Sequence, residues 1–234
     1  MKKIGIIGGL GPEATGDYYR ELISKFRTVN RENELTYPEI IIYSVNMAEF
    51  IGNLKKMNYR EAAEYIASCI NKLESAGVDF AAISANTPHL LFDDISRQVS
   101  IPLISIVESC KTKAVEMGLK RCGLFGTKFT MEADFYPDSF LQTGITVVMP
   151  ENKDILRINE LLFSELEIGI FKEESKSELL DIVKKMISNQ GIDSLILGCT
   201  EFPLMFTEGQ YLGIPFLNTT RIHVEEIVQE CLAG

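Results

Sequence analysis

The most constraining feature of the chain is an internal repeat. Gly77-Val78-Asp79 leads to Ala85, and Gly191-Ile192-Asp193 leads to Cys199, with eight positions from the glycine to the last residue in both copies. An Ile-Pro pair follows each copy, and an apolar run that ends in glycine precedes each at a similar distance. This self-similarity predicts two lobes of similar fold, with Ala85 and Cys199 at equivalent places.

Short apolar runs alternate with longer amphipathic ones, which is the pattern of a parallel sheet covered by helices. We therefore predict an α/β fold of two lobes, each a parallel sheet flanked by helices. The first lobe is expected to hold residues 1–104 plus 216–234, and the second residues 105–215. The final helix, Thr219 to Leu232, is expected to pack on the first lobe. Residues 46–58 show neither period and are interpreted as a mobile flap over a site.

Composition excludes several classes of partner. A formal net charge of −10 argues against nucleic acid or an anionic membrane surface, because both require a basic patch. No apolar run reaches membrane-spanning length, so we expect a cytoplasmic protein whose partner is a small molecule. The five cysteines are widely spaced and contain no C-x-x-C, which predicts neither a disulfide framework nor a metal site.

One cysteine stands apart from the other four. Cys199 follows the apolar run Leu195 to Gly198 and precedes Thr200 and Glu201, where a buried strand is expected to open into a helix. Ligands bind at such strand ends. The positive end of the helix is expected to lower the pKa of the thiol. We therefore predict that Cys199 is catalytic. The remaining cysteines are interpreted as buried structural thiols: Cys69, Cys110, Cys122 and Cys231.

Other polar residues are candidates for the same site. His89 lies four positions after Ala85 and is either a catalytic base or a partner in local hydrogen bonds, whereas His223 is interpreted as structural. Thr127 and Thr130 place hydroxyl groups at a predicted helix start, which suits an anionic group such as a carboxylate.

A dinucleotide site is the main rival interpretation. Residues 9–14 match G-x-G-x-x-A after a predicted strand. The acidic residue expected at the end of the second strand is replaced by Ser44-Val45-Asn46, and Pro12 removes an amide that would hold pyrophosphate. The sequence therefore disfavours a nucleotide.

Three motifs in register resemble the aspartate/glutamate racemases: residues 4–15, residues 85–89 and residues 198–201. The resemblance spans the whole chain. It implies two α/β lobes related by a pseudo-twofold, an active site between them, a homodimer, no cofactor and an amino acid or related carboxylate as substrate. One cysteine from each lobe exchanges the α-proton, which makes Cys199 the acid/base of the second lobe. The residues expected to bind substrate are Leu10, Asn46, Asn86, Thr87, Thr127, Thr130, Thr200 and Glu201.

The chain departs from this pattern in two respects. Ala85 occupies the position of the first-lobe cysteine, so Ala85 and His89 mark a partner position without a thiol. Aspartate-specific relatives also hold the side-chain carboxylate with an arginine after the second strand and a lysine in the second lobe. Here these places are near Asn46 to Glu49 and near Glu167, with Lys172 the closest base. Two alternatives therefore stay open beside the racemase: a single-cysteine decarboxylase or isomerase, and a binding protein without turnover.

Overall fold

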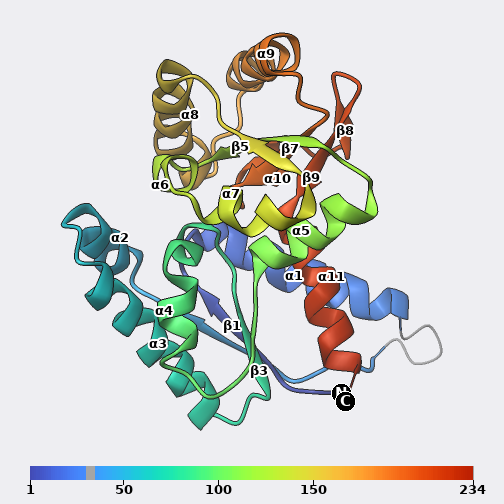
Figure 1. Cartoon of the computed structure of the whole chain (residues 1–234). Helices are drawn as coiled ribbons and strands as arrows, with labels where there is room; N and C mark the ends of the chain where they lie inside the picture. The colour runs from blue at the N-terminus through green and yellow to red at the C-terminus, as the bar shows by residue number, and fades with distance from the viewer. Residues whose placement is uncertain (30–34, 234) are drawn as a thin grey trace. The chain divides into compact units, whose positions relative to one another are not determined.

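The computed structural model describes residues 1–29 and 35–233 and divides into two compact units (Figure 1). Unit 1 comprises Met1–Ile106 and His223–Gly234, and unit 2 comprises Val107–Ile222. Both units are parallel sheets flanked by helices, as predicted. In the described part of the chain, no helix is long and apolar enough to cross a membrane.

Unit 1 is built on a four-stranded parallel sheet. Its strand order is β2 (Ile40–Ser44), β1 (Ile4–Gly8), β3 (Phe80–Ile83) and β4 (Leu103–Ile104). The two central strands, β1 and β3, are buried at every position, which explains their unbroken apolar sequences.

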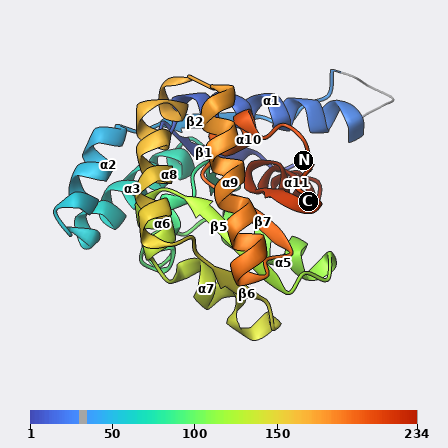
Figure 2. The ribbon, with the colours of Figure 1, turned by 90° about the horizontal axis from the view of Figure 1, so that it is seen from above.

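Helix α3 (Tyr59–Ser75) packs against β1, β2 and β3 of this sheet, and α2 (Met47–Lys55) lies beside α3 (Figures 1 and 2). In α3 the buried residues recur at helical spacing and include Cys69, as predicted. The final helix, α11, packs in this unit from His223 onward, also as predicted: Tyr18 Oη and His223 Nδ1 lie 2.9 Å apart. The helical segments are α1 (Pro12–Val29), α2 (Met47–Lys55), α3 (Tyr59–Ser75), the 3₁₀ turn η1 (Thr87–Leu91), α4 (Phe92–Ser96) and α11 (Thr219–Leu232).

Unit 2 repeats the strand order of unit 1 and adds one edge strand. Its sheet runs β6 (Thr146–Val148), β5 (Arg121–Gly126), β7 (Ser194–Gly198), β9 (Ile214–Asn218) and β8 (Gln210–Tyr211), with β8 antiparallel. The helical segments are α5 (Ile106–Glu116), α6 (Lys128–Glu132), α7 (Phe135–Phe140), η2 (Leu141–Thr143), α8 (Asn152–Ser164), η3 (Leu166–Ile168), α9 (Glu173–Gln190) and α10 (Phe202–Met205).

The repeated aspartates explain why the repeat is visible in the sequence. Asp79 Oδ2 accepts a hydrogen bond from the backbone N–H of Lys3 at 2.6 Å, and Asp193 Oδ2 accepts one from Lys120 at 2.7 Å. Each aspartate thus ties the start of one strand to the start of the neighbouring strand. The registers of β1 with β3 and of β5 with β7 then place Ala85 and Cys199 at equivalent strand ends, as predicted.

Two expectations differ from the structure. Residues 216–222 lie in unit 2 rather than with the first lobe, because β9 pairs with β7. The segment interpreted as a mobile flap contains the helix α2, which Asn46 caps by accepting a hydrogen bond from the N–H of Ala48. Only Phe50 and Leu54 of α2 are buried, and so short an apolar face gave no clear period in the sequence.

Candidate active site

Cys199 leaves the sheet of unit 2 directly after its most buried strand. All five residues of β7 are buried. Gly198 is required at the strand end, because a Cβ there would lie 2.8 Å from the carbonyl oxygen of Phe125 on β5. Cys199 itself is buried, as are the other four cysteines, and all five are free thiols.

The thiol of Cys199 lies against a carboxylate. Cys199 Sγ donates a hydrogen bond to Glu201 Oε2 at 2.9 Å, and Thr200 Oγ1 donates one to the same oxygen at 3.2 Å. All three side chains are buried. The local sequence therefore folds into a compact hydrogen-bonded group, in which a thiol and a hydroxyl donate to one carboxylate oxygen.

A second carboxylate reaches the thiol from a distant part of the sequence. Glu167 lies on η3, and its carboxylate, the Cys199 thiol and the Glu201 carboxylate have ligand atoms within 4.8 Å of one another. In the sequence, Glu167 only marks the region where aspartate-specific relatives have a lysine, and it was not expected in the site. No spacing could have revealed it, because η3 and β7 are joined by the whole of α9.

These surroundings set the acidity of each group. Burial, followed by the negative charges of Glu201 and Glu167, raises the pKa of Cys199 well above its ordinary value. Burial and the charge of Glu201 raise the pKa of Glu167 to about 8, and burial raises the pKa of Glu201. The expected lowering of the thiol pKa by a helix is therefore wrong: α10 begins only at Phe202 and has four residues, which gives a small dipole against two carboxylates.

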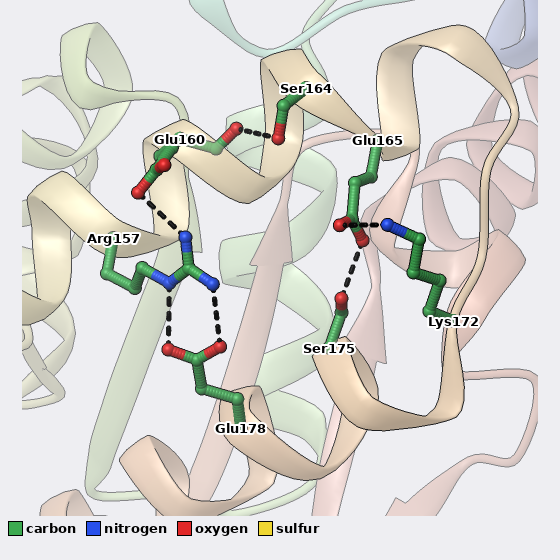
Figure 3. A network of polar contacts seen from close by, with 7 residues as sticks. All are labelled: Arg157, Glu160, Ser164, Glu165, Lys172, Ser175 and Glu178. Atoms are coloured by element: carbon green, nitrogen blue, oxygen red, sulfur yellow. Dashed lines mark hydrogen bonds and ion pairs between the residues drawn. The ribbon is translucent and has the colours of Figure 1, made fainter.

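Surface ion pairs fix the segment that carries Glu167 (Figure 3). Glu165 accepts hydrogen bonds from Lys172 Nζ at 2.7 Å and from Ser175 Oγ at 2.6 Å. Arg157 on α8 holds Glu178 on α9 with two N–H groups, at 2.8 and 3.0 Å. Lys172, the base nearest to Glu167 in sequence, is thus engaged with Glu165.

The predicted hydroxyl pair lies on the neighbouring strand end. Thr127 caps α6, because its Oγ1 accepts a hydrogen bond from the N–H of Thr130, and the two hydroxyl oxygens lie 3.1 Å apart. Gly126 pairs with Gly198, so the threonines and Cys199 leave adjacent strands at the same edge of the sheet. A Cβ at Gly198 would lie 3.5 Å from Thr130 Cγ2, which places this methyl group beside the strand that leads to the thiol.

The candidates of unit 1 gather at the corresponding edge of their own sheet. Leu10 follows β1, Asn46 follows β2 and Ala85, Asn86 and Thr87 follow β3. Ala85 and Asn86 are buried, Thr87 is half-buried and Asn46 is exposed. Ala85 presents only a methyl group at the place that a thiol occupies in unit 2.

His89 is held in a structural role. Its Nε2 accepts a hydrogen bond from the N–H of Ile106 at 3.2 Å, so its Nδ1 carries the proton and donates to the carbonyl oxygen of Ala85 at 3.1 Å. Burial, with a smaller effect from His223, lowers the pKa of His89 to about 3. Of the two interpretations left open by the sequence, local hydrogen bonding is the one that the structure displays.

Comparison with known proteins decides the family. The profile described as Asp/Glu/Hydantoin racemase matches residues 7–227. The chain belongs to this family. An aspartate racemase homologue from Pyrococcus horikoshii OT3 is 35% identical in sequence, and the two structures superpose with a TM-score of 0.81 over 99% of each chain.

Two racemases match the chain over shorter stretches. The broad specificity amino-acid racemase RacX of Bacillus subtilis is 28% identical over 146 residues, which are 62% of this chain and 63% of RacX. The glutamate racemase of Aquifex aeolicus is 25% identical over 181 residues, covering 74% of this chain and 68% of the enzyme. The chain thus spans about two thirds of the length of these relatives.

Proposed function

We propose that the protein is an isomerase that exchanges the α-proton of an amino acid without a cofactor, with Cys199 as the acid/base. The observation that carries this proposal is the 2.9 Å hydrogen bond from the Cys199 thiol to the buried carboxylate of Glu201. A thiol in this position can pass its proton to the carboxylate and then, as a thiolate, remove a proton from carbon. Membership in the racemase family supports the same reaction.

The raised pKa of Cys199 defines what must happen before proton transfer. Two carboxylates oppose formation of the thiolate in the empty site. A substrate ammonium group beside Glu167 and Glu201 offsets their charge and so lowers the free energy of the thiolate. The substrate thereby activates its own base, and the proton that leaves Cys199 is taken by Glu201.

The proposed contacts to the rest of the substrate follow from the strand ends. The hydroxyl groups of Thr127 and Thr130 bind the α-carboxylate, because hydroxyl and amide donors at a chain turn suit an anion. Thr200 binds the same part of the substrate. From unit 1, we propose that Asn86 and Thr87 bind the carboxylate or the amine and that Leu10 and Asn46 line the site. We also propose a homodimer, as the resemblance implies.

The two carboxylates also restrict the side chain of the substrate. A second substrate carboxylate placed near Glu167 would bring a negative charge to two carboxyl groups whose pKa values are already raised by burial. Lys172, the nearest base in sequence, is paired with Glu165. We therefore propose an amino acid with a neutral or basic side chain as substrate. The name of RacX, a broad specificity amino-acid racemase, is consistent with this choice.

Ala85 supports a second candidate reaction at the same site. An alanine side chain can neither give nor take a proton, so only one face of the substrate has a thiol. A decarboxylase or isomerase that needs a proton on one face would use this arrangement fully.

Proton NMR in deuterium oxide tests both candidates. The expected result is loss of the α-proton signal of neutral or basic amino acids, with aspartate and glutamate exchanging more slowly. Exchange with inversion supports a racemase, and exchange with retention supports one-sided chemistry. Release of carbon dioxide from malonate-type acids would favour the decarboxylase. A shift in melting temperature with ligand but without exchange would show a binding protein and overturn the proposal.

A further inference from the structure

Among the described residues, the group formed by Glu167, Cys199 and Glu201 offers three ligand atoms within 4.8 Å of one another. All three belong to unit 2, so their arrangement depends on one compact body. A cysteine sulfur and two carboxylate oxygens are ligand types that zinc binds, and three protein ligands leave its fourth position open for water. Neither carboxylate was part of a metal motif in the sequence.

An independent feature of Glu201 points to a missing ligand. Its side chain is 1% exposed, and Oε2 accepts hydrogen bonds from Cys199 and Thr200. Its other oxygen, Oε1, is buried and has no hydrogen-bond partner among the described residues. A buried carboxylate oxygen without a partner is costly, and such groups in native proteins commonly mark an ion or water that completes the site.

The ligand set of the group favours a cation. The Cys199 thiol donates to Glu201 Oε2 at 2.9 Å, and a carboxyl oxygen of Glu167 completes the group. Lys172, the base nearest to Glu167 in sequence, is engaged with Glu165 at 2.7 Å. The group is therefore rich in ligand atoms, in a buried setting where electrostatic attraction is strong.

We propose that Glu167, Cys199 and Glu201 bind one Zn²⁺, with water as the fourth ligand. Zinc bond lengths of about 2.3 Å to sulfur and 2.0–2.2 Å to oxygen place tetrahedral ligand atoms roughly 3.4–3.6 Å apart. The present group requires shifts of about 1 Å to reach these values. On binding, the protons of the Cys199 thiol and of the protonated carboxyl groups leave for the solvent, lone pairs of the sulfur and of the carboxylate oxygens bond to the ion, and no oxidation occurs.

Binding of zinc has a consequence for catalysis. A sulfur bonded to zinc is unavailable to remove or deliver a proton, so the ion inhibits the enzyme until a chelator removes it. This consequence depends on the proposed function, whereas binding itself does not. Direct titration without substrate therefore separates failure of the zinc site from failure of the racemase assignment.

The test is calorimetric titration of Zn²⁺ into the reduced, chelator-treated full chain, with Co²⁺ absorption as a second measurement. We expect one equivalent of Zn²⁺ to bind and to release protons, detected by repeating the titration in buffers of different ionisation enthalpy. Co²⁺ at the same site should show the intense sulfur-to-metal band of a thiolate complex. Cys199→Ala should weaken binding by at least about 100-fold, and Glu167→Gln or Glu201→Gln by at least about 10-fold.

Cys110→Ala is the matched control, because Cys110 is a buried free thiol of the same unit. It should leave zinc affinity unchanged, and circular dichroism should show that each variant is folded. Three results would overturn the proposal: no binding to the wild-type chain at millimolar Zn²⁺, equal affinity in Cys199→Ala, or bound Co²⁺ without a thiolate band. None of these measurements requires an activity assay, and the Co²⁺ spectrum requires only the wild-type chain.

Discussion

The ends of β3 and β7 occupy the same place in two sheets of the same strand order, yet they present different chemistry. After β3 comes the methyl group of Ala85, whose carbonyl oxygen binds a neutral imidazole. After β7 comes the thiol of Cys199, which lies among two carboxylates. Asp79 and Asp193 meanwhile accept hydrogen bonds from the equivalent backbone N–H groups of Lys3 and Arg121. The residues that stabilise the repeated fold are therefore separate from those that give each copy its chemistry.

Two histidines of unit 1 and one glutamate of unit 2 respond to pH in opposite directions. The buried titratable groups of unit 1 include His89 and His223, with pKa values lowered to about 3 and about 4. Unit 2 contains Glu167, with a pKa raised to about 8. The histidines bind fewer protons in the folded than in the unfolded state, so their contribution to the free energy of unfolding is lost as pH falls below 6.5. Glu167 binds more protons folded, so its contribution is lost as pH rises from 4.5 toward 8.

Replacing the thiol should produce the largest change. Cys199→Ser keeps the size and the hydrogen bond to Glu201, but a hydroxyl is a far weaker acid than a thiol. We expect α-proton exchange to fall by about 10³-fold, with little change in the free energy of unfolding. Proton NMR in deuterium oxide and urea denaturation measure the two effects. Cys122→Ser in the same unit is the control, and a Cys199→Ser enzyme with most of its exchange would remove Cys199 from the mechanism.

Lowering the pH should remove the stability that the neutral histidines of unit 1 contribute. His223 accepts from Tyr18 and donates to the carbonyl oxygen of Ile104, and His223→Gln keeps a donor and an acceptor without an ionisable ring. With an unfolded pKa of 6.5 and a folded value of about 4, wild type loses about 2 kcal/mol at this site between pH 7 and 5. The difference in the free energy of unfolding between wild type and His223→Gln, measured by urea denaturation, should decrease by that amount. A constant difference between the two pH values would show that His223 is not held neutral.

The repeat explains which parts of the fold could be predicted from sequence. Strand positions follow from apolar runs that are buried on both faces, and the equivalence of Ala85 and Cys199 follows from aspartates with a repeated backbone contact. The helix α2 was missed because two buried residues make too short an apolar face. The boundary at residue 216 was misplaced because pairing of β9 with β7 joins segments far apart in sequence.

The candidate site was predictable only where it is local in sequence. Cys199, Thr200 and Glu201 are adjacent, so a motif could identify them together. Glu167 comes to the thiol through the packing of η3 and adds, after burial and Glu201, to the rise in the pKa of Cys199. Burial and a carboxyl group distant in sequence therefore account for the difference between the expected and the observed direction of the Cys199 pKa shift, and the catalytic role of Cys199 stays a prediction.

The threonine pair tests whether unit 2 alone binds the substrate carboxylate. Thr130→Val removes a hydroxyl that lies 3.1 Å from Thr127 Oγ1. We expect kcat/KM to fall by about 1–3 kcal/mol, or roughly 5- to 150-fold. Because Thr130 is fully buried, the variant should also lose about 1 kcal/mol of stability. Steady-state kinetics and urea denaturation measure both. An unchanged kcat/KM would place the carboxylate elsewhere, and Thr143→Val, on the same unit, serves as the control.

The smallest expected change restores the symmetry of the repeat. Ala85→Cys adds one sulfur atom at the strand end equivalent to that of Cys199, where a methyl group now stands. Ala85 is buried, so the larger side chain should cost about 1 kcal/mol of stability. If loss of this thiol is what makes the natural chemistry one-sided, the variant should invert amino acids about 10-fold faster, since a general acid or base contributes at least this much.

The repeat places Thr87 where unit 2 has Glu201, so a cysteine at position 85 has no carboxylate two residues along the chain, and this difference makes the variant informative. A cysteine at position 85 has His89, a neutral and hydrogen-bonded imidazole, as its nearest described titratable neighbour in sequence. Without a carboxylate two residues along the chain, this thiol is expected to ionise more readily than Cys199, and the gain should be greatest in the direction in which its thiolate removes the α-proton. Circular dichroism of L- and D-amino acids with both proteins measures the two directions. A variant that binds ligand but gains in neither direction would show that equivalence in the fold does not carry over to the reaction, and the one-sided isomerase or decarboxylase would then be the better assignment.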